Sequence, residues 1–200
     1  MPHRQRVFIH EWAIAGSSLL DVTAERTAMA FSEVVGNFAY IDNQNLYMAT
    51  HGADEPWDVD MRRFRVYLRE KYHVVCAYLF MGAFEIKRQE MYRAFQEYGY
   101  ILIFREHGME LKGKKKGNVD VDVVFEMMRD NFTSAQMEKA VLVSGDGDYF
   151  RTVRYLVDMG KFEKVILPSH KGASSLYKQL SDEYRVYIDG DSFKRKIGRK

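Results

Sequence analysis

Four aspartates are the residues of this 200-residue chain whose type and spacing best suit chemistry. Asp42 directly follows the apolar run FAYI at residues 38–41, and Asp146 and Asp148 directly follow the apolar run AVLVS at residues 140–144. Asp120 stands in the first turn of an expected helix within the segment KGNVDVDVVFEMMRD. Two carboxylates about 4 Å apart repel each other by about 4 kcal/mol at an effective dielectric constant of about 20, so a cluster of them favours raised pKa values or a bound cation.

The donor chemistry of these positions narrows the choice of cation. Carboxylate oxygens, without cysteine or histidine, suit a hard ion such as Mg²⁺ or Mn²⁺. Such an ion acidifies water and neutralises charge on a phosphoryl oxygen, which phosphodiester hydrolysis requires. Asp122 and Glu126, further along the same expected helix, are possible additional ligands. Each acid alone also has a structural explanation, because aspartates cap helices and form turns after strands, so the metal site is inferred from their conjunction.

The elements expected to position these acids alternate between apolar strands and amphipathic helices from about residue 37 onward. Strands are expected at residues 38–41, 74–80, 100–104, 140–144, 164–168 and 185–188, and helices at residues 58–71, 84–98, 119–131 and 148–159. Wholly apolar strands that alternate with helices predict an α/β fold, a three-layer sandwich with a mainly parallel central sheet. Ligands of such sheets bind beyond the carboxyl ends of the strands, which is where the aspartates stand.

Composition excludes several classes of protein. With 46% hydrophobic residues, the chain can build one domain with a sizeable core, and a net charge of +2 fits neither a basic arm nor an acidic tail. The single cysteine, Cys76, leaves no internal disulfide and no cysteine-based metal framework, which favours a reducing, cytoplasmic setting. No run of 18 apolar residues occurs, so no membrane span is expected.

Three segments resemble the NYN domain family of PIN-like nucleases, in the LabA-like bacterial branch. FAYIDNQNLY at residues 38–47 resembles the family's Y-I-D-x-x-N opening, and KGKKKGNVDVDVVFEMMRD at residues 112–130 resembles its K-G-x-V-D segment. VLVSGDGDYF at residues 141–150 is similar to its S-G-D-x-D-F segment. The resemblance runs from about residue 37 to residue 187 and implies a PIN-like, Rossmann-like fold.

The resemblance also implies a function, a metal-dependent endoribonuclease that uses Mg²⁺ or Mn²⁺ and acts on RNA, most often single-stranded. The positions that match the family's catalytic and metal-binding residues are Asp42, Asn45, Asp120, Asp146 and Asp148. Ser144 and Tyr149 match motif positions beside the last two aspartates, where Ser144 is expected to hold the carboxylate loop and both are expected to lie at the substrate. Glu126 falls where many members of the family have aspartate, and glutamate places its carboxylate on a longer side chain.

A lysine cluster precedes the expected helix and is interleaved with Gly113 and Gly117. Its proximity to Asp120 predicts a loop that grips the substrate's phosphates, although a solvated charge run is the alternative. The cluster consists of Lys112, Lys114, Lys115 and Lys116.

Other functions and boundaries stay open at this point. A catalytically silent RNA-binding or regulatory module would keep the same acids, whereas a phosphatase with an aspartyl nucleophile is disfavoured because IDNQN lacks D-x-D-x-T.

Residues 1–36 are expected to be an extension of unknown role, residues 37–190 the domain and residues 191–200 a basic tail. Apolar edge strands and a nearly neutral surface favour a homodimer.

Overall fold

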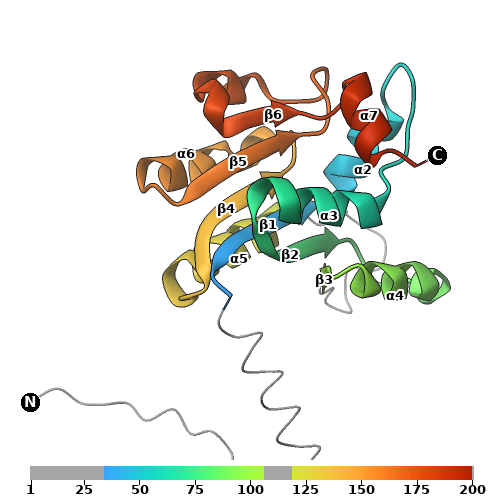
Figure 1. Cartoon of the computed structure of the whole chain (residues 1–200), viewed down its shortest axis with the longest axis horizontal. Coiled ribbons are helices and arrows are strands. Elements are labelled where there is room, and N and C mark those ends of the chain that lie inside the picture. Colours follow the sequence, from blue (N-terminus) through green and yellow to red (C-terminus); the bar gives the residue numbers. More distant parts are fainter. Residues whose placement is uncertain (1–33, 106–118, 200) are drawn as a thin grey trace, which may run out of the picture. The chain divides into compact units, whose positions relative to one another are not determined.

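Six parallel strands form one sheet at the centre of the computed structural model, which describes residues 34–105 and 119–199 (Figure 1). Their order in the sheet is β3-β2-β1-β4-β5-β6. The strands are β1 (Gly36–Asp42), β2 (Val74–Met81), β3 (Ile101–Phe104), β4 (Met137–Val143), β5 (Phe162–Leu167) and β6 (Arg185–Tyr187). Every strand pair is parallel, so all carboxyl ends lie at the same edge, as the sequence pattern predicted.

Helices cover both faces of the sheet and complete the three layers (Figure 1). One face is packed by α5 (Asp120–Thr133) and α6 (Phe150–Asp158), and the other by α2 (Asn43–His51), α3 (Met61–Tyr72), α4 (Gln89–Glu97) and α7 (Asp191–Ile197). Side chains of β1 alternate between the two cores, with Phe38 and Tyr40 toward α5 and Ala39 and Ile41 toward α3. The fold is therefore a three-layer α/β sandwich.

The chain reverses its direction across the sheet between β1 and β4. β1, β2 and β3 are laid side by side in one direction, and β4 then returns to pair with the free side of β1, with Ile41 opposite Val143. Crevices beyond the carboxyl ends of strands at such a switch point are the usual ligand sites of open α/β sheets. Asp42 and the residues after Val143 meet at that point.

Several expected elements differ at their ends. The helix expected at residues 84–98 starts with a 3₁₀ turn at Ile86–Arg88 and becomes α-helical only at Gln89, and the helix expected from residue 148 starts with the 3₁₀ turn η3 (Gly147–Tyr149). The expected basic tail contains α7, whose Phe193 ring packs edge-on against Tyr67 at 5.9 Å between centroids. Ile197 at its end is fully buried, so this segment is part of the fold.

The edges of the sheet are short. β3 has four residues and β6 has three, so the long apolar edges on which the homodimer expectation depended are not found in the described part of the chain. Nothing in the described residues indicates a dimer.

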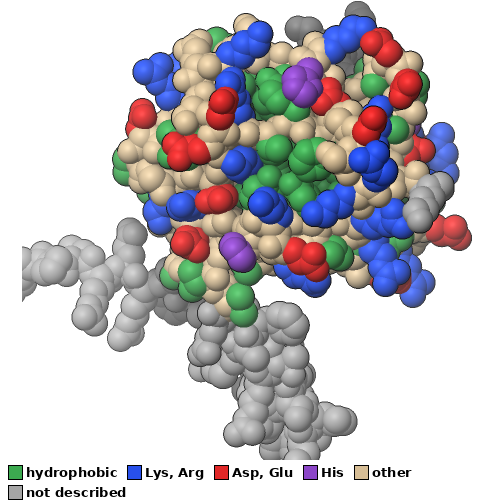
Figure 2. Space-filling view, turned by 45° about the horizontal axis from the view of Figure 1, so that its top comes forward, with side chains coloured by type: hydrophobic (Ala, Val, Ile, Leu, Met, Phe, Trp, Pro, Cys, Tyr) green, Lys and Arg blue, Asp and Glu red, His purple; other side chains and the backbone are tan. Residues whose placement is uncertain are grey.

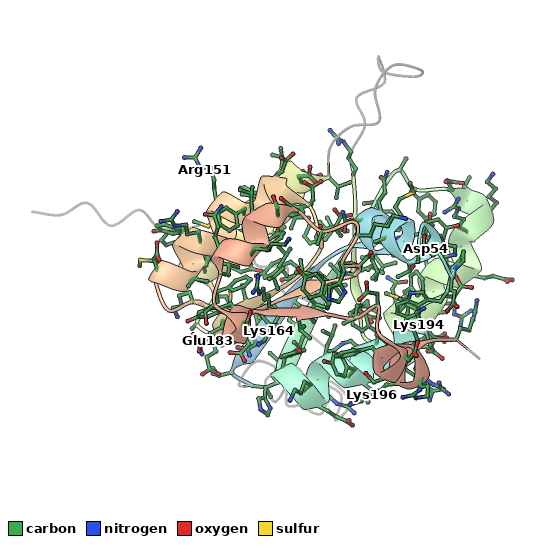
Figure 3. The ribbon with its side chains drawn as sticks, turned by 90° about the horizontal axis from the view of Figure 1, so that it is seen from above. Asp54, Arg151, Lys164, Glu183, Lys194 and Lys196 are labelled. Carbon is green, nitrogen blue, oxygen red and sulfur yellow. The ribbon has the colours of Figure 1, made fainter. Side chains whose placement is uncertain are left out.

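Two ion pairs contact the loop between α2 and α3. Lys171 Nζ lies 3.0 Å from Asp54 Oδ1, and Lys194 Nζ on α7 lies 3.6 Å from Glu55 Oε2. Figure 3 shows Asp54 and Lys194 at the same end of the domain. Within residues 34–105 and 119–199, no helix is long and apolar enough to cross a membrane.

Candidate metal centre

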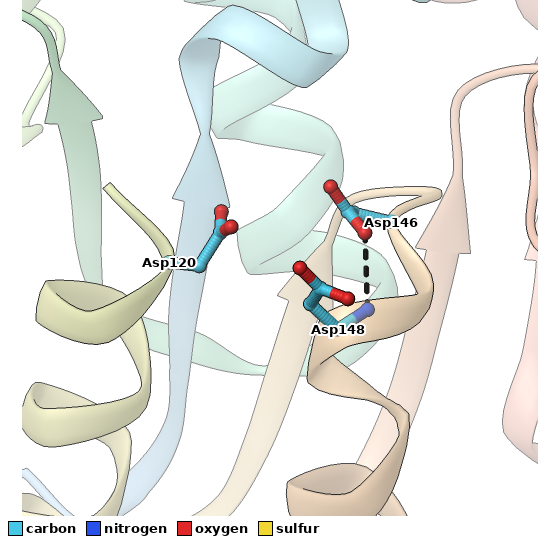
Figure 4. Close-up of side chains that lie close together, drawn as sticks. All are labelled: Asp120, Asp146 and Asp148. Carbon is cyan, nitrogen blue, oxygen red and sulfur yellow. Dashed lines mark hydrogen bonds between the residues drawn. The ribbon is translucent and has the colours of Figure 1, made fainter. Parts of the chain in front are cut away.

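Three of the four predicted aspartates bring their carboxylates together at the carboxyl edge of the sheet. One carboxylate oxygen each of Asp120, Asp146 and Asp148 can be chosen so that all lie within 4.8 Å of one another (Figure 4). Asp120 is the first residue of α5, whereas the other two stand on the turn that follows β4. Asp146 caps η3, because its Oδ1 accepts a hydrogen bond of 3.0 Å from the backbone N–H of Asp148. Asp146 therefore caps η3 and also belongs to the carboxylate cluster.

Hydrogen bonds fix the turn that carries Asp146. Ser144 is fully buried and its Oγ accepts from the backbone N–H of Asp146 at 3.1 Å. The hydroxyl of Tyr177, in the 3₁₀ helix η4 (Ser175–Gln179), donates to the carbonyl oxygen of Asp146 at 2.6 Å. Since buried polar groups are normally paired, these contacts hold the turn in one conformation.

The two glycines around Asp146 allow close packing against the loop that follows β5. A Cβ atom on Gly145 would lie 3.2 Å from the Cα of Ala173, and a Cβ on Gly147 would lie 2.6 Å from Ser174 Oγ. The backbone N–H of Ser174 also donates to the carbonyl oxygen of Gly145 at 2.8 Å. The glycines therefore let a third segment buttress the carboxylate turn.

Asp42 lies deeper than the other acids and is 5% exposed. Its Oδ1 caps α2 by accepting from the backbone N–H of Asn45 at 2.9 Å, and Asn45 Oδ1 in turn accepts from the backbone N–H of Gly145 at 2.8 Å. Burial raises the pKa of Asp42, and the negative charges of Asp120 and Asp146 add to this, against the hydrogen bonds from Asn45 and Tyr149. Asn45 thus ties the first strand to the carboxylate turn.

Tyr149 joins the buried acid to the cluster. Its hydroxyl lies 2.6 Å from Asp120 Oδ1 and 3.1 Å from Asp42 Oδ2, and its side chain is fully buried. A phenol carries one hydrogen, so it donates to one of these carboxylates at a time. Burial, followed by the neighbouring carboxylates, raises the pKa of Tyr149, which keeps the hydroxyl protonated as a donor.

The structure separates other predicted residues from the cluster. Asp122 and Glu126 are turned by roughly 200° and 240° around α5 from Asp120, at 100° per residue, and neither belongs to the three-carboxylate group. Glu126 instead pairs with Arg129. Lys112, Lys114, Lys115 and Lys116 lie outside the described residues.

Two residues expected at the substrate have other contacts. Tyr149 and Ser144 are fully buried, so neither offers an exposed surface to a base, and both instead position the carboxylates. Tyr177 and Ser174 were not anticipated as supports, since only the serine-rich segment SHKGASSLY after β5 hinted at a structured loop there.

The oxygens present fit a divalent cation. Ligand oxygens about 2.1 Å from an octahedral Mg²⁺ are roughly 3 to 4.2 Å apart, close to the spread of up to 4.8 Å in the cluster. Asp120 and Asp146 are half-buried and Asp148 is exposed, which leaves room for the waters that Mg²⁺ retains. Asp120, Asp146 and Asp148 are therefore the residues that would hold such an ion.

A parallel α/β sandwich with aspartates at its switch point defines a domain of the PIN-like class. A match to the NYN domain family spans residues 39–191, and the chain belongs to that family. Because NYN domains belong to a nuclease superfamily, this places the chain among nuclease-like, RNA-related proteins.

Two individual proteins resemble the chain. The low amplitude and bright protein LabA of Synechococcus elongatus is 29% identical over 165 residues, which cover 75% of this chain and 86% of LabA. The crystal structure of a Vibrio parahaemolyticus protein of unknown function matches with a TM-score of 0.64 at 21% identity, covering 80% of this chain and 97% of that chain. The first likeness makes the chain LabA-like, and the second supports the fold.

Proposed function

We propose that the chain is a metal-dependent ribonuclease that hydrolyses internal phosphodiester bonds of RNA. The observation that carries this proposal is the convergence of Asp120, Asp146 and Asp148 within 4.8 Å at the switch point of an NYN domain. Three such charges are stable together when a cation lies among them. Mg²⁺ or Mn²⁺ is the ion that this oxygen-only set suits.

The roles of the residues follow from their contacts. Asp120, Asp146 and Asp148 would hold the ion, and Asp42, which lies behind them, adds a further negative charge and is the fourth predicted ligand. Tyr149 and Asn45 act as positioning residues, because they fix the carboxylates of Asp120 and Asp42 and the backbone of the turn. When bound, the ion supplies acidified water and charge neutralisation for in-line hydrolysis. No side-chain nucleophile is needed.

Affinity for RNA has to come from local groups of cations. Figure 2 shows Lys and Arg side chains interleaved with Asp and Glu on the face it presents, in keeping with the net charge of +2. A mixed surface gives no long-range field of one sign. The lysines at residues 112–116 remain the predicted phosphate contacts, and each contact made would steepen the salt dependence by about 0.7 in log–log slope for single-stranded RNA.

The decisive experiment incubates end-labelled single-stranded RNA with the protein in Mn²⁺, in Mg²⁺ and in EDTA. Wild-type protein should cleave in either metal and not in EDTA. Asp120→Asn and Asp146→Asn should lose cleavage, whereas Asp122→Asn, the same change on the same helix, is the matched control and should retain most of it. Metal-dependent cleavage that survives in Asp146→Asn would contradict the assignment. Salt-sensitive binding without cleavage in any condition would identify an RNA-binding module instead.

A further inference from the structure

A cavity of about 850 Å³ opens beside the carboxylates, between α2, α3, α4 and the carboxyl end of β2. It adjoins the candidate metal centre through Asn43 and Gln44, which follow Asp42, and through Val119, which precedes Asp120. Its volume lies within the range of about 300 to 1,000 Å³ that is usual for sites of small organic ligands. The three-carboxylate cluster itself does not line it.

Arg105 lines this cavity, and its guanidinium carries one hydrogen-bond donor without a partner among the described residues. It follows β3, and its backbone N–H donates to the carbonyl oxygen of Met81 at 3.3 Å, which anchors it at the end of β2. Its Nη1 is buried and has no hydrogen-bond partner in the part of the chain that the structure describes. A buried guanidinium nitrogen without a partner is unfavourable unless a ligand completes it. An anionic group is the natural complement, because arginine binds phosphate with charge-assisted hydrogen bonds.

Apart from Arg199, whose side chain is exposed, the other charged side chains of the cavity wall already have partners. Arg88 Nε lies 3.3 Å from Glu85 Oε2, and His51 Nε2 lies 2.9 Å from Asp58 Oδ1. Asp60 caps α3 through the backbone N–H of Arg63. Among the arginines of the wall, Arg105 is the one that carries a buried nitrogen without a hydrogen-bond partner in the described ranges.

Besides the polar residues Asn43, Gln44 and Thr50, the remaining wall is mostly apolar and aromatic. It includes Met81, Met91, Tyr92 and Phe95, and at its rim the ring of Tyr47, 56% exposed, stacks on His51 at 3.8 Å between centroids. Flat apolar surfaces next to a cationic donor suit a ligand that combines an aromatic ring with a phosphate. Such a ligand has the chemistry of a nucleotide.

We propose that this cavity binds one nucleoside monophosphate unit, with its phosphate on Arg105 and its base against the apolar wall. The identification of the unit as part of an RNA strand depends on the proposed function, since the cavity would then hold a nucleotide next to the scissile phosphate. A free mononucleotide offers the same groups. The two sources are separated by the experiment.

The first test measures binding in EDTA, so that neither metal nor cleavage contributes. AMP and UMP are titrated by calorimetry, and a labelled single-stranded RNA by fluorescence anisotropy. Arg105→Gln should weaken binding by roughly tenfold, the usual effect of losing a charge-assisted hydrogen bond. Arg88→Gln is the matched control, because Arg88 lines the same cavity but already pairs with Glu85. It should bind within about twofold of wild type.

A second variant fills the cavity without removing charge. Gly82 lines the cavity, and a Cβ atom there would meet no other atom within 4 Å. Gly82→Trp should therefore fold normally and block the ligand. Gly190→Trp is its control, since Gly190 has equally open surroundings and is not a wall residue.

The outcomes separate this inference from the proposed function. Loss of binding in both Arg105→Gln and Gly82→Trp, but in neither control, supports the pocket even if no condition yields RNA cleavage. If only the RNA shows this pattern, the occupant is a nucleotide of the strand, and if AMP or UMP shows it as well, the free nucleotide is also a ligand. RNA cleavage by a protein whose nucleotide and RNA binding are unchanged in both variants would overturn the pocket and leave the nuclease intact. Absence of any nucleotide and RNA binding would also overturn it.

Discussion

Two buried tyrosines form hydrogen bonds with aspartates near the two termini of α5, and the two aspartates differ in their surroundings. At the start of the helix, the hydroxyl of Tyr149 lies 2.6 Å from Asp120 Oδ1. In its last turn, the hydroxyl of Tyr40 donates to Asp130 Oδ2 at 3.0 Å. Both tyrosines are fully buried on the same face of the sheet. The same type of contact therefore fixes α5 at the carboxyl edge of the sheet and at its amino edge.

The surroundings of the two aspartates differ in charge. Asp130 is 4% exposed and has its own cation, since Arg129 Nη2 lies 2.8 Å from its Oδ1. Asp120 lies close to the carboxylates of Asp146 and Asp148. A charge that is paired within the fold contributes to structure, whereas gathered like charges favour a ligand of opposite sign. The difference in charge distinguishes Asp130 from the aspartate that we propose to bind metal more clearly than burial does.

The largest expected difference between the Asp120 cluster and Asp130 concerns metal binding. At a Mn²⁺ concentration about one hundredfold above its Kd, an ion that binds only the folded state adds about 2.7 kcal/mol of stability. For a domain of this size that corresponds to a rise in Tm of roughly 5 to 10 °C. Asp146→Asn should lose most of the rise and Asp130→Asn should keep it, as measured by calorimetry with and without EDTA. An equal rise in both variants would place the ion elsewhere.

The tyrosine hydroxyls provide the next test. Tyr149→Phe should lower RNA cleavage and metal affinity by about 10- to 100-fold, the usual effect of removing a group that orients metal ligands. Tyr40→Phe removes the same atom at the other end of α5 and should leave cleavage within about twofold of wild type. Initial rates over a Mn²⁺ titration measure both. Equal losses in the two variants would mean that the hydroxyls only stabilise the helix.

The sequence predicted the central strands and the acids at their ends because both depend on local pattern. β1, β2 and β4 are apolar over most of their length, and Asp42 and Asp146 follow such runs directly. α2 was missed, since NQNLYMATH has little amphipathic character and was interpreted only as a motif. α7 was missed because FKRKIGRK is mostly charged, and its helix is held by two apolar anchors, Phe193 and Ile197.

The supports of the site could not be predicted in the same way. Tyr177 binds a backbone carbonyl 31 positions earlier, and Ser174 packs on Gly147. These contacts arise because β5 pairs with β4 and brings its following loop onto the carboxylate turn, which no local pattern encodes. For the same reason Tyr149 was expected at the substrate, although the turn of η3 directs it into the core.

Removing the charge of Asp42 should stabilise the protein without metal. Asp42→Asn should raise the free energy of unfolding at pH 7 by about 1 kcal/mol, a typical gain when a functional strain is relieved. Asparagine is an equally good N-cap, and its amide can donate to Tyr149 while Tyr149 donates to Asp120. Asp130→Asn, which breaks a paired charge, should instead lower stability.

The pH dependence of that gain has a definite sign. Because burial raises the pKa of Asp42, the folded state holds this proton more tightly than the unfolded chain, and wild-type stability falls as pH rises through the raised pKa. The advantage of Asp42→Asn should be largest at neutral pH and disappear below the ordinary pKa of an aspartate. Denaturant unfolding at a series of pH values measures this, and a gain that grows toward acid pH would refute it.

The smallest expected effect concerns Cys76 on β2, near the amino-edge aspartate. Burial raises the pKa of its thiol, and the charge of Asp130 adds to this, whereas the hydrogen bond with Tyr78 and the charge of Arg65 oppose it. Alkylation by iodoacetamide at pH 8 should therefore be several-fold slower in the folded protein than in denaturant. Asp130→Asn should quicken the folded reaction by roughly twofold, since less negative charge faces the thiolate, whereas Asp146→Asn should not change it. Because Cys76 is the single cysteine of the chain, mass spectrometry of the intact protein follows the reaction directly. Equal rates in all three proteins would mean that Arg129 cancels the charge of Asp130, so that this ion pair has no electrostatic effect on the thiol.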